Sequence, residues 1–324
     1  MNKTRTMIWM ALAMFPSLTS AAGVPPECDR QCLAGIADAY MRALTANDPA
    51  AAPLDQNVRF TENGQELMIG DALWGTADRL RDYRIRIADP ESRQIAIIGI
   101  VEEGSLPGLL AVRLKISGRK VSEAEHVIAR SSNPSAYAKL KTPRSAFARV
   151  LPKDARSDRK TLVRIANAYF DGIENDTAQG VPFSKDCNRL ENGLQTTNNP
   201  NLTLGHDLDP REAEAVSNAA ALGCRAQFER GGFDFISEIT PRRFAVVDEE
   251  RGLVFGIFGF VHDGRHMTMT LSDGSKVPTP TFATVPNNVL MAEVFRIENG
   301  RIHEIEAVGA NVPYRSGTGW PDQD

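Results

Sequence analysis

The sequence predicts an α+β protein built from two similar domains in tandem. The first observation is an amphipathic helical segment, residues 33–44, which returns as residues 162–173. Both copies carry apolar residues at the i, i+3, i+4, i+7, i+8, i+11 spacing of one buried helical stripe. The coinciding positions, all at an offset of 129 residues, are 33/162, 36/165, 37/166, 40/169, 41/170 and 44/173.

The second observation is that the sequence after each helix also repeats in register. Residues 53–64 align with residues 182–193 at the same offset, and both copies pass through Glu-Asn-Gly. Asn-Gly is typical of a tight hairpin turn. Apolar or alternating segments then follow in both halves, which predicts a helix followed by a meander of antiparallel strands. The expected strands are 83–87, 94–103, 109–116, 121–128, 233–239, 242–248, 252–262, 289–297 and 301–308.

The length of 324 residues suits two domains rather than one core. We expect a first domain at 24–130, a linker at 131–156 and a second domain at 157–312. Residues 196–228 have no counterpart in the first half and form an insertion, with a helix at 210–221 capped by Asp209. The aromatic and Gly-rich tail, 313–324, is expected to pack back on the body.

The N-terminus has the pattern of a cleaved secretory signal over residues 1–22. Lys3 and Arg5 precede an apolar run at 7–18 and small residues at 19–23. The alternative is a membrane anchor, but the run is shorter than the roughly 20 residues of a spanning helix. We therefore expect export to a periplasm or the outside of the cell, with no membrane contact after cleavage.

Four cysteines in an exported chain favour two disulfides. The natural pairs are Cys28 with Cys32 and Cys187 with Cys224. A Cys-x-x-x-Cys pair is also compatible with zinc, but no close His or second Cys pair supports a metal site.

Charge and motifs exclude several classes of function. The net charge of -4 gives no basic field for nucleic acid. The sequence has no Gly-x-Gly-x-x-Gly, no phosphate-binding Gly-Lys-Ser/Thr loop, no His-Glu-x-x-His and no Gly-x-Ser-x-Gly. We expect no cofactor.

A long opening helix ending in Asn-Asp, a short strand, and a last hairpin of the form apolar-x-apolar-x-x-Gly-Arg-apolar before Glu-x-Glu resemble the NTF2-like (SnoaL-like, cystatin-like) fold. The resemblance covers each half and implies a curved antiparallel sheet wrapped around the long helix, with a conical pocket open at one end. The family includes isomerases, dehydratases, cyclases and epoxide hydrolases with carboxylates, His or Tyr in the cone. It also includes members that only bind or dimerise, so a homodimer through the sheet faces is a further expectation.

The candidate catalytic residues lie in the second half: Glu191, Arg243, Asp248 and His262. A carboxylate in apolar surroundings has a raised pKa, and His titrates near working pH. Alternation along 242–248 puts Arg243 on the face of Ala245 and Val247. The structural alternatives are a Glu that braces its own turn, a solvated turn at 248–252 and a hydrogen-bonded His.

The candidate ligand-binding residues are Glu62, Trp74, Tyr83, Tyr169 and Glu306. Glu62 occupies the place of Glu191 in the first repeat, and Glu306 ends the last strand, where it could enter the cone. Aromatic residues at such positions are more often core than ligand platforms.

The expected function is that of an exported, cofactor-independent enzyme of the lyase, isomerase or hydrolase type, acting on a small organic molecule in the second-domain pocket. The alternative is a non-catalytic ligand-binding or assembly module. A cone filled by Tyr169, Phe170, Phe255 and Phe258 favours the second hypothesis, and paired ionisable groups in an open cone favour the first.

Overall fold

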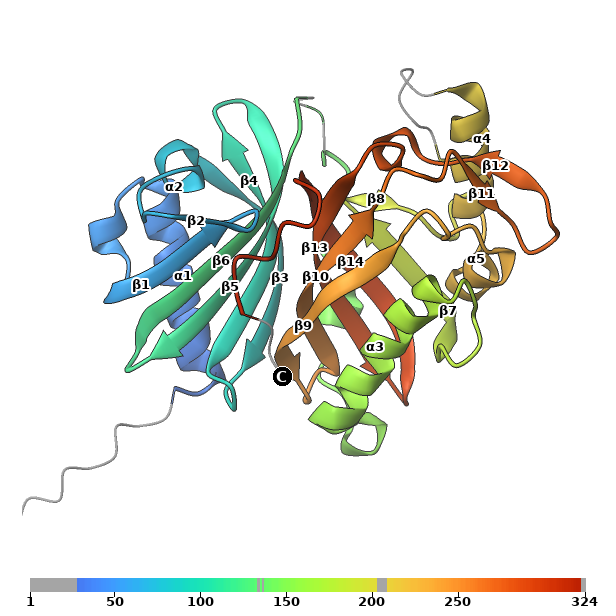
Figure 1. Ribbon diagram of the computed structural model, residues 1–324. Coiled ribbons are helices and arrows are strands. Elements are labelled where there is room, and N and C mark those ends of the chain that lie inside the picture. The colour runs from blue at the N-terminus through green and yellow to red at the C-terminus, as the bar shows by residue number, and fades with distance from the viewer. Residues whose placement is uncertain (1–27, 133–134, 136, 203–208, 322–324) are drawn as a thin grey trace, which may run out of the picture.

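The computed structural model describes residues 28–132, 135, 137–202 and 209–321. The predicted signal segment, residues 1–22, lies outside these ranges. Within them the chain forms two six-stranded sheets, each with a long helix on one face (Figure 1).

The repeated helices α1 (Arg30–Thr45) and α3 (Arg159–Glu174) begin in the same way. The carboxylate of Asp29 accepts a hydrogen bond from the backbone N–H of Cys32, and that of Asp158 accepts one from Thr161. Such N-caps satisfy amides that have no partner within the helix. All six coinciding apolar positions are buried in both helices, so the repeat in the sequence is a repeat in structure.

Both sheets have the same strand order. The first is β2-β1-β6-β5-β4-β3 and the second is β8-β7-β14-β13-β10-β9. The strands of the first sheet are β1 (Leu54–Glu62), β2 (Gln65–Leu67), β3 (Arg79–Asp89), β4 (Gln94–Glu103), β5 (Leu106–Ser117) and β6 (Lys120–Arg130). Those of the second are β7 (Phe183–Glu191), β8 (Leu194–Gln195), β9 (Glu238–Asp248), β10 (Leu253–His262), β13 (Asn287–Glu298) and β14 (Arg301–Val312).

The sheets are mixed, whereas the prediction was a purely antiparallel meander. β1 pairs with β6 in parallel, and β7 pairs with β14 in parallel. A parallel pair needs a long crossover, and the intervening strands supply it in each half. The segments 233–239 and 242–248, predicted as two strands, are also corrected: a single strand β9 begins at Glu238.

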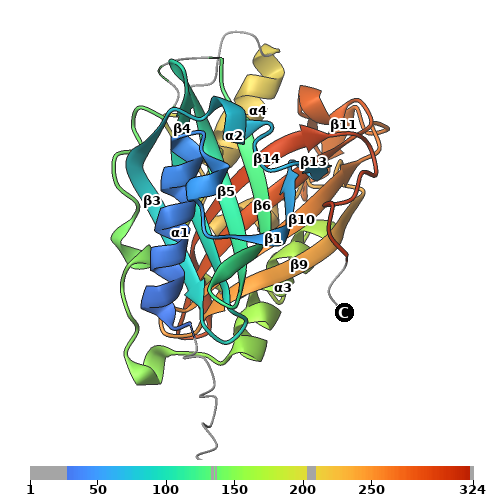
Figure 2. The same cartoon turned by 90° about the vertical axis from the view of Figure 1, so that its left-hand side faces the viewer.

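The two sheets pack against each other through the faces that their helices leave uncovered. This domain interface contains the buried side chains of Tyr83, Ile85 and Ile98 from the first sheet and of Phe255 and Ile257 from the second. Figure 2, turned from Figure 1, shows α1 on the outer face of the first sheet. The layers are therefore helix, sheet, sheet, helix, and the sheet faces expected to form a homodimer are occupied within the chain.

Smaller elements connect and extend this body. Between the domains lie two 3-10 turns, η2 (Ser145–Phe147) and η3 (Lys153–Ala155). In the first domain η1 (Pro49–Ala51) and α2 (Leu73–Thr76) follow α1 and β2. The second domain adds α4 (Pro210–Ala220), α5 (Cys224–Arg230), β11 (Thr268–Thr270), β12 (Lys276–Pro278) and η4 (Thr281–Ala283), and Figure 1 shows α4, α5, β11 and β12 gathered at one end.

The C-terminal tail returns to the first domain, as predicted. The Trp320 indole N–H donates to Thr61 at 2.8 Å. Its ring lies 4.4 Å from the guanidinium of Arg59 and 4.7 Å from that of Arg113. Cation–π contacts of this kind hold the tail on the sheet.

A buried ion cluster joins the two sheets. The Glu125 carboxylate accepts from Arg113 at 2.7 Å within the first domain and from Arg243 of the second domain at 2.8 Å. The three side chains are at most 2% exposed. Glu125 is thus shared by two guanidiniums that have left water, Glu123 is a second partner of Arg113 at 2.8 Å, and the pairing with Arg243 fixes one sheet against the other.

Replacing Glu125 with Ala leaves both guanidiniums buried with the shared carboxylate gone. Breaking a buried pair costs about 3–5 kcal/mol, so we expect the free energy of unfolding in urea to fall by that amount. Glu66→Ala, which removes the 64% exposed partner of Arg59, is the control and should cost less than about 1 kcal/mol. Equal costs for the two variants would contradict the structural role of Glu125.

Candidate functional site

The interior of the first domain holds a polar network between α1 and its sheet. The Trp74 indole donates to the Tyr40 hydroxyl at 3.1 Å, and that hydroxyl lies 2.9 Å from Nε2 of His126. The Tyr40 and Trp74 rings meet edge to face, with centroids 5.0 Å apart. Trp74 was a candidate ligand platform, and it lies in the core with its one donor used.

Glu62 braces the same network. Its carboxylate accepts from the backbone N–H of Leu73 at 3.1 Å and from Arg130 at 2.8 Å. Burial acts to raise the pKa of Glu62, but His126 and Arg130 hold it below its usual value. The group is therefore an ionised brace between β1, α2 and β6, which corresponds to the structural alternative.

The interior of the second domain differs from the first at two equivalent positions. At an offset of 129, Phe60 on β1 becomes Arg189 on β7. The last hairpin of each domain also differs. Val112 on β5 pairs with His126 in the first domain, and at the equivalent place Glu293 on β13 pairs with Ala307 in the second. An apolar pair in one domain is thus an ionisable pair in the other.

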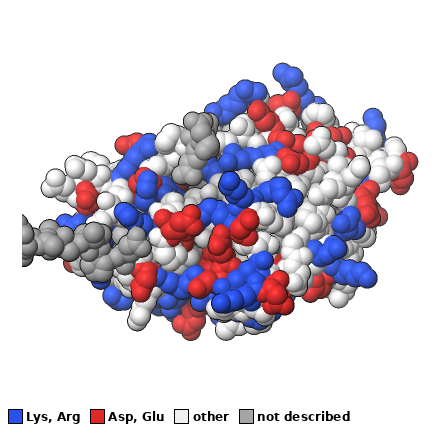
Figure 3. All heavy atoms as spheres, turned by 90° about the horizontal axis from the view of Figure 1, so that it is seen from below, with Lys and Arg blue, Asp and Glu red and all other residues white. Residues whose placement is uncertain are grey.

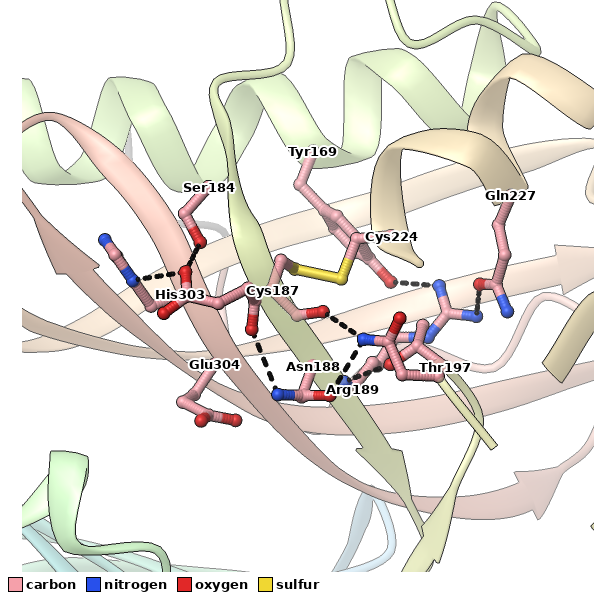
Figure 4. Close-up of a disulfide and its surroundings, with 12 residues drawn as sticks. Tyr169, Ser184, Cys187, Asn188, Arg189, Thr197, Cys224, Gln227, His303 and Glu304 are labelled. Carbon is pink, nitrogen blue, oxygen red and sulfur yellow. Dashed lines mark hydrogen bonds and ion pairs between the residues drawn. A yellow bond between two sulfur atoms is a disulfide. The ribbon is translucent and has the colours of Figure 1, made fainter. Parts of the chain in front are cut away.

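Arg189 lies between α3 and the insertion (Figure 4). Its guanidinium donates to the Tyr169 hydroxyl at 3.1 Å and to Oε1 of Gln227 on α5 at 2.8 Å. Its Nε lies 3.0 Å from Glu191, whose side chain is 39% exposed. Against the opposing effect of burial, Glu191 and Tyr169 raise the pKa of Arg189, so it stays charged.

Glu293 is the unpaired member of this group. Its side chain projects from β13 into the second-domain core and is 2% exposed, and Oε2 has no hydrogen-bond partner among the described residues. Burial, reinforced by the charge of Glu191, raises its pKa to about 8, although Arg189 acts in the opposite direction. Glu293 is therefore a neutral carboxylic acid at pH 7.

The members of this group differ in exposure: Glu191 is 39% exposed, whereas Tyr169, Arg189 and Glu293 are buried. Below them the apolar part of the cone is filled by the rings of Phe170, Phe258 and Phe295. We call Tyr169, Arg189, Glu191, Gln227 and Glu293 the second-domain polar cluster.

The Cys187–Cys224 disulfide supports the polar cluster (Figure 4). It ties β7, which carries Arg189, to the start of α5, which carries Gln227. Both predicted disulfides are present, the other being Cys28–Cys32. Two disulfides indicate an oxidising compartment.

Arg243 and Asp248 lie in the domain interface and not in the cone. Strict alternation is wrong here because a β-bulge at Ala245 puts Val246 on the interface side and Val247 on the helix side. The buried carboxylate of Asp248 accepts from Arg30 of the first domain at 2.8 Å, so it is an inter-domain ion pair and not a solvated turn. The carboxylate that Arg243 needs is Glu125.

Tyr83 and Glu306 also lie in the interface, where the Tyr83 hydroxyl donates to the Glu306 carboxylate. The side chains of the last strands alternate, and Ile305 takes the cone side. Glu306 therefore does not enter the cone. Burial raises its pKa to about 7.

His262 ends β10, far from Asp248 at the other end of the same strand pair. Nine residues of strand separate Leu253, which pairs with Asp248, from His262, and this is about 30 Å. Its ring stacks on Phe235 with centroids 5.6 Å apart, and burial lowers its pKa to about 4. It is a neutral packing residue at pH 7.

The structure brings Glu191 and Tyr169 together and leaves the other candidates apart from them. Arg189, Gln227 and Glu293 were missed. Two of these three were detectable, because Arg189 and Glu293 are among the positions where the repeats mismatch in polarity.

Neither a metal centre nor a membrane span is found in the part of the chain that the structure describes. No three His, Cys, Asp or Glu side chains there are grouped to hold an ion. No helix there has the length and apolar character needed to cross a bilayer.

Residues 155–309 match the model of a family described as a domain of unknown function (DUF8021). This segment contains every member of the polar cluster. The chain is also similar to a crystal structure of an NTF-2 like protein of unknown function from Burkholderia xenovorans LB400 at 1.85 Å resolution. The two sequences are 11% identical, the match covers 35% of this chain and 94% of that chain, and the TM-score is 0.23. No curated protein matches the chain.

The two disulfides should differ in their effect on stability. Cys187 and Cys224 are 37 residues apart and Cys28 and Cys32 only 4. Loop entropy then gives about 4 kcal/mol for the first and about 2 kcal/mol for the second. Urea denaturation of the two double Cys→Ser variants measures this, and a larger loss for the Cys28/Cys32 variant would contradict it.

Glu293 should make stability depend on pH. Between about pH 4.5 and about pH 8 the unfolded chain has released this proton while the folded protein keeps it. The stabilisation is therefore full below pH 4.5 and is lost as the pH rises to 8, by on the order of 1.4 kcal/mol per pH unit.

Glu293→Gln cannot ionise and keeps a similar shape. We expect its free energy of unfolding to be close to that of the wild type near pH 4.5 and to exceed it increasingly up to pH 8. The control is Glu214→Gln, on the exposed face of α4, which should show no such trend. Parallel pH profiles for wild type and Glu293→Gln would contradict the buried acid.

Proposed function

We propose that the second domain is an exported, cofactor-independent enzyme domain of the lyase or isomerase type, acting on a small organic acid at its polar cluster. The observation that carries the proposal is a buried carboxylic acid, Glu293, whose Oε2 has no hydrogen-bond partner among the described residues and whose pKa is influenced by a second buried ionisable group, Arg189. Groups with perturbed pKa values that converge in one place are typical of acid–base sites.

The two side chains have complementary roles. Arg189 offers a planar set of donors that a substrate carboxylate binds in place of Glu191, the one partner that is well exposed. Tyr169 and Gln227 hold the guanidinium in position. Glu293, un-ionised at pH 7, is the proton donor.

Elimination of water from a β-hydroxy acid is the simplest reaction that this pair supports. Glu293 gives its proton to the leaving hydroxyl, which departs as water. In the same step the other oxygen of the Glu293 carboxyl takes the proton from the carbon next to the substrate carboxylate, which leaves a carbon–carbon double bond and restores the acid; the reverse addition of D2O places deuterium on that carbon. The negative charge that develops on the substrate lies on oxygens held by Arg189.

The first domain has a structural role in this proposal. Its equivalents of Arg189 and Glu293 are Phe60 and Val112, which are both buried core residues. We also propose that both halves are NTF2-like domains, since each repeats the helix, the strand order and the last hairpin that carry the resemblance. The two disulfides support the proposed export to a periplasm or the outside of the cell.

The test is proton exchange from small β-hydroxy and β-keto carboxylates in D2O, followed by NMR at the carbon next to the carboxylate. We expect the protein to accelerate exchange for members of the panel and Glu293→Gln to lower the rate by about 100-fold or more. Glu214→Gln should keep the wild-type rate. Full activity in Glu293→Gln, or no acceleration by the wild type across the panel, would refute the proposal.

The second candidate function is a non-catalytic binding or assembly module. The observation that favours it is the filled apolar cone, in which Phe170 and Phe295 pack on Tyr169 and Phe258 packs on Phe170. Phe255, expected among them, belongs to the domain interface instead. A protein that binds carboxylates through Arg189 without accelerating exchange would support this second function.

A further inference from the structure

A groove outside the polar cluster crosses the free edge of the first sheet. It has a volume of about 750 Å³, within the usual range of ligand sites. One wall is the start of α1, the floor is the edge strand β3 with Ile95 of β4, and the other wall is the linker at 143–148 with Arg251 from the β9–β10 turn. Both domains therefore contribute to it.

The charges that line the groove are unbalanced. Five arginines line it and only one acid, Asp29, and the Asp29 carboxylate caps α1. The arginines are Arg30, Arg84, Arg86, Arg144 and Arg251. The positive end of the α1 dipole lies in the same place.

Four of these arginines pair with carboxylates that do not line the groove. Asp248 pairs with both Arg30 and Arg251, and Glu250 is a second partner of Arg30. Arg144 pairs with Glu304 at 2.7 Å. Figure 3 shows the molecule from below, where basic and acidic side chains are intermixed.

Arg84 is the arginine with no compensation. It is exposed, and its side chain has no ion pair or hydrogen bond with the residues that the structure describes. Arg86, two residues along the same face of β3, is held by Asp38. A solvated surface side chain is the ordinary state of such an Arg, but here it lies at the mouth of a concave site whose walls carry four more arginines.

The groove also has an apolar surface. Ile85, Ala88, Ile95 and Phe147 line it between the arginines and are otherwise buried. An inorganic anion gains nothing from contact with such an apolar surface, whereas a ligand with a carbon skeleton covers the surface and removes it from water. The arginines at the rim and the apolar floor together fit an anion with an organic body.

We propose that this groove binds a small organic dianion, with two oxyanion groups on an apolar skeleton. One group contacts Arg84, the other contacts the arginines of the opposite wall, and the skeleton lies on Ile85 and Phe147. The site is separate from the polar cluster and does not depend on the function proposed there. Because its walls come from both domains, a bound ligand also stabilises their packing.

Titration calorimetry with adipate, at fixed ionic strength and pH 7, tests the proposal. Hexanoate has one charge, 1,6-hexanediol has none, and sulfate has two charges without a carbon chain. We expect adipate to bind at least 10-fold more tightly than each of these, and its affinity to fall with added salt because the attraction between charges is screened.

Two matched variants locate the site. Arg84→Gln removes an unpaired exposed guanidinium and should not disturb folding, and it should weaken adipate binding by 10-fold or more. Arg164→Gln, on the exposed face of α3, is the control and should bind as the wild type does. Glu293→Gln should also bind adipate normally, which separates this site from the polar cluster.

Three outcomes would overturn the proposal: no binding of adipate by the wild type, equal binding of adipate and sulfate, or equal affinities for Arg84→Gln and Arg164→Gln. Loss of adipate binding in Glu293→Gln would place the dianion in the second-domain cone and would also overturn it.

Discussion

Each sheet of this protein has two apolar faces and only one helix to cover them. Strands β4 and β10, each the second strand from one edge of its sheet, are buried along nearly their whole length. Their side chains are therefore covered on both faces of the sheet. Strands in such a position cannot face water on either side. The packing of one sheet on the other is therefore the constraint on which the rest of the structure depends, because neither domain can cover its second face by itself.

The ion pairs in the interface follow from this packing. A charge buried between two packed sheets needs a partner that compensates it. Arg243 meets Glu125, and Asp89 accepts from the backbone N–H of Val247 at 3.0 Å and from Arg159. Gln94 donates to the carbonyl of Ala245 at 2.9 Å. The polar residues of the interface thus specify how the sheets are aligned, and the apolar residues supply the stabilisation.

The same constraint explains which predictions succeeded. Helical periodicity predicted the buried stripes of α1 and α3, because a helix has one apolar face and the spacing identifies it. A strand with two apolar faces gives no sign of which face lies against the helix and which against the other domain. Tyr83, Arg243 and Glu306 were for this reason assigned to the cones when they belong to the interface. The bulge at Ala245 has no signal in the sequence, and it reverses the side on which the following residues lie.

The two halves of the chain provide a comparison that bears on function. Phe60 and Val112 fill their positions in the first domain without any unpaired polar group. The second domain has the same fold and places Arg189 and Glu293 there, at the cost of burying a guanidinium and an acid that lacks a partner. An apolar pair of similar volume is as stable as a buried ionisable pair or more so. Stability therefore does not account for the polar residues in the second domain, and this is the reason for the proposal that they bind a ligand or transfer a proton.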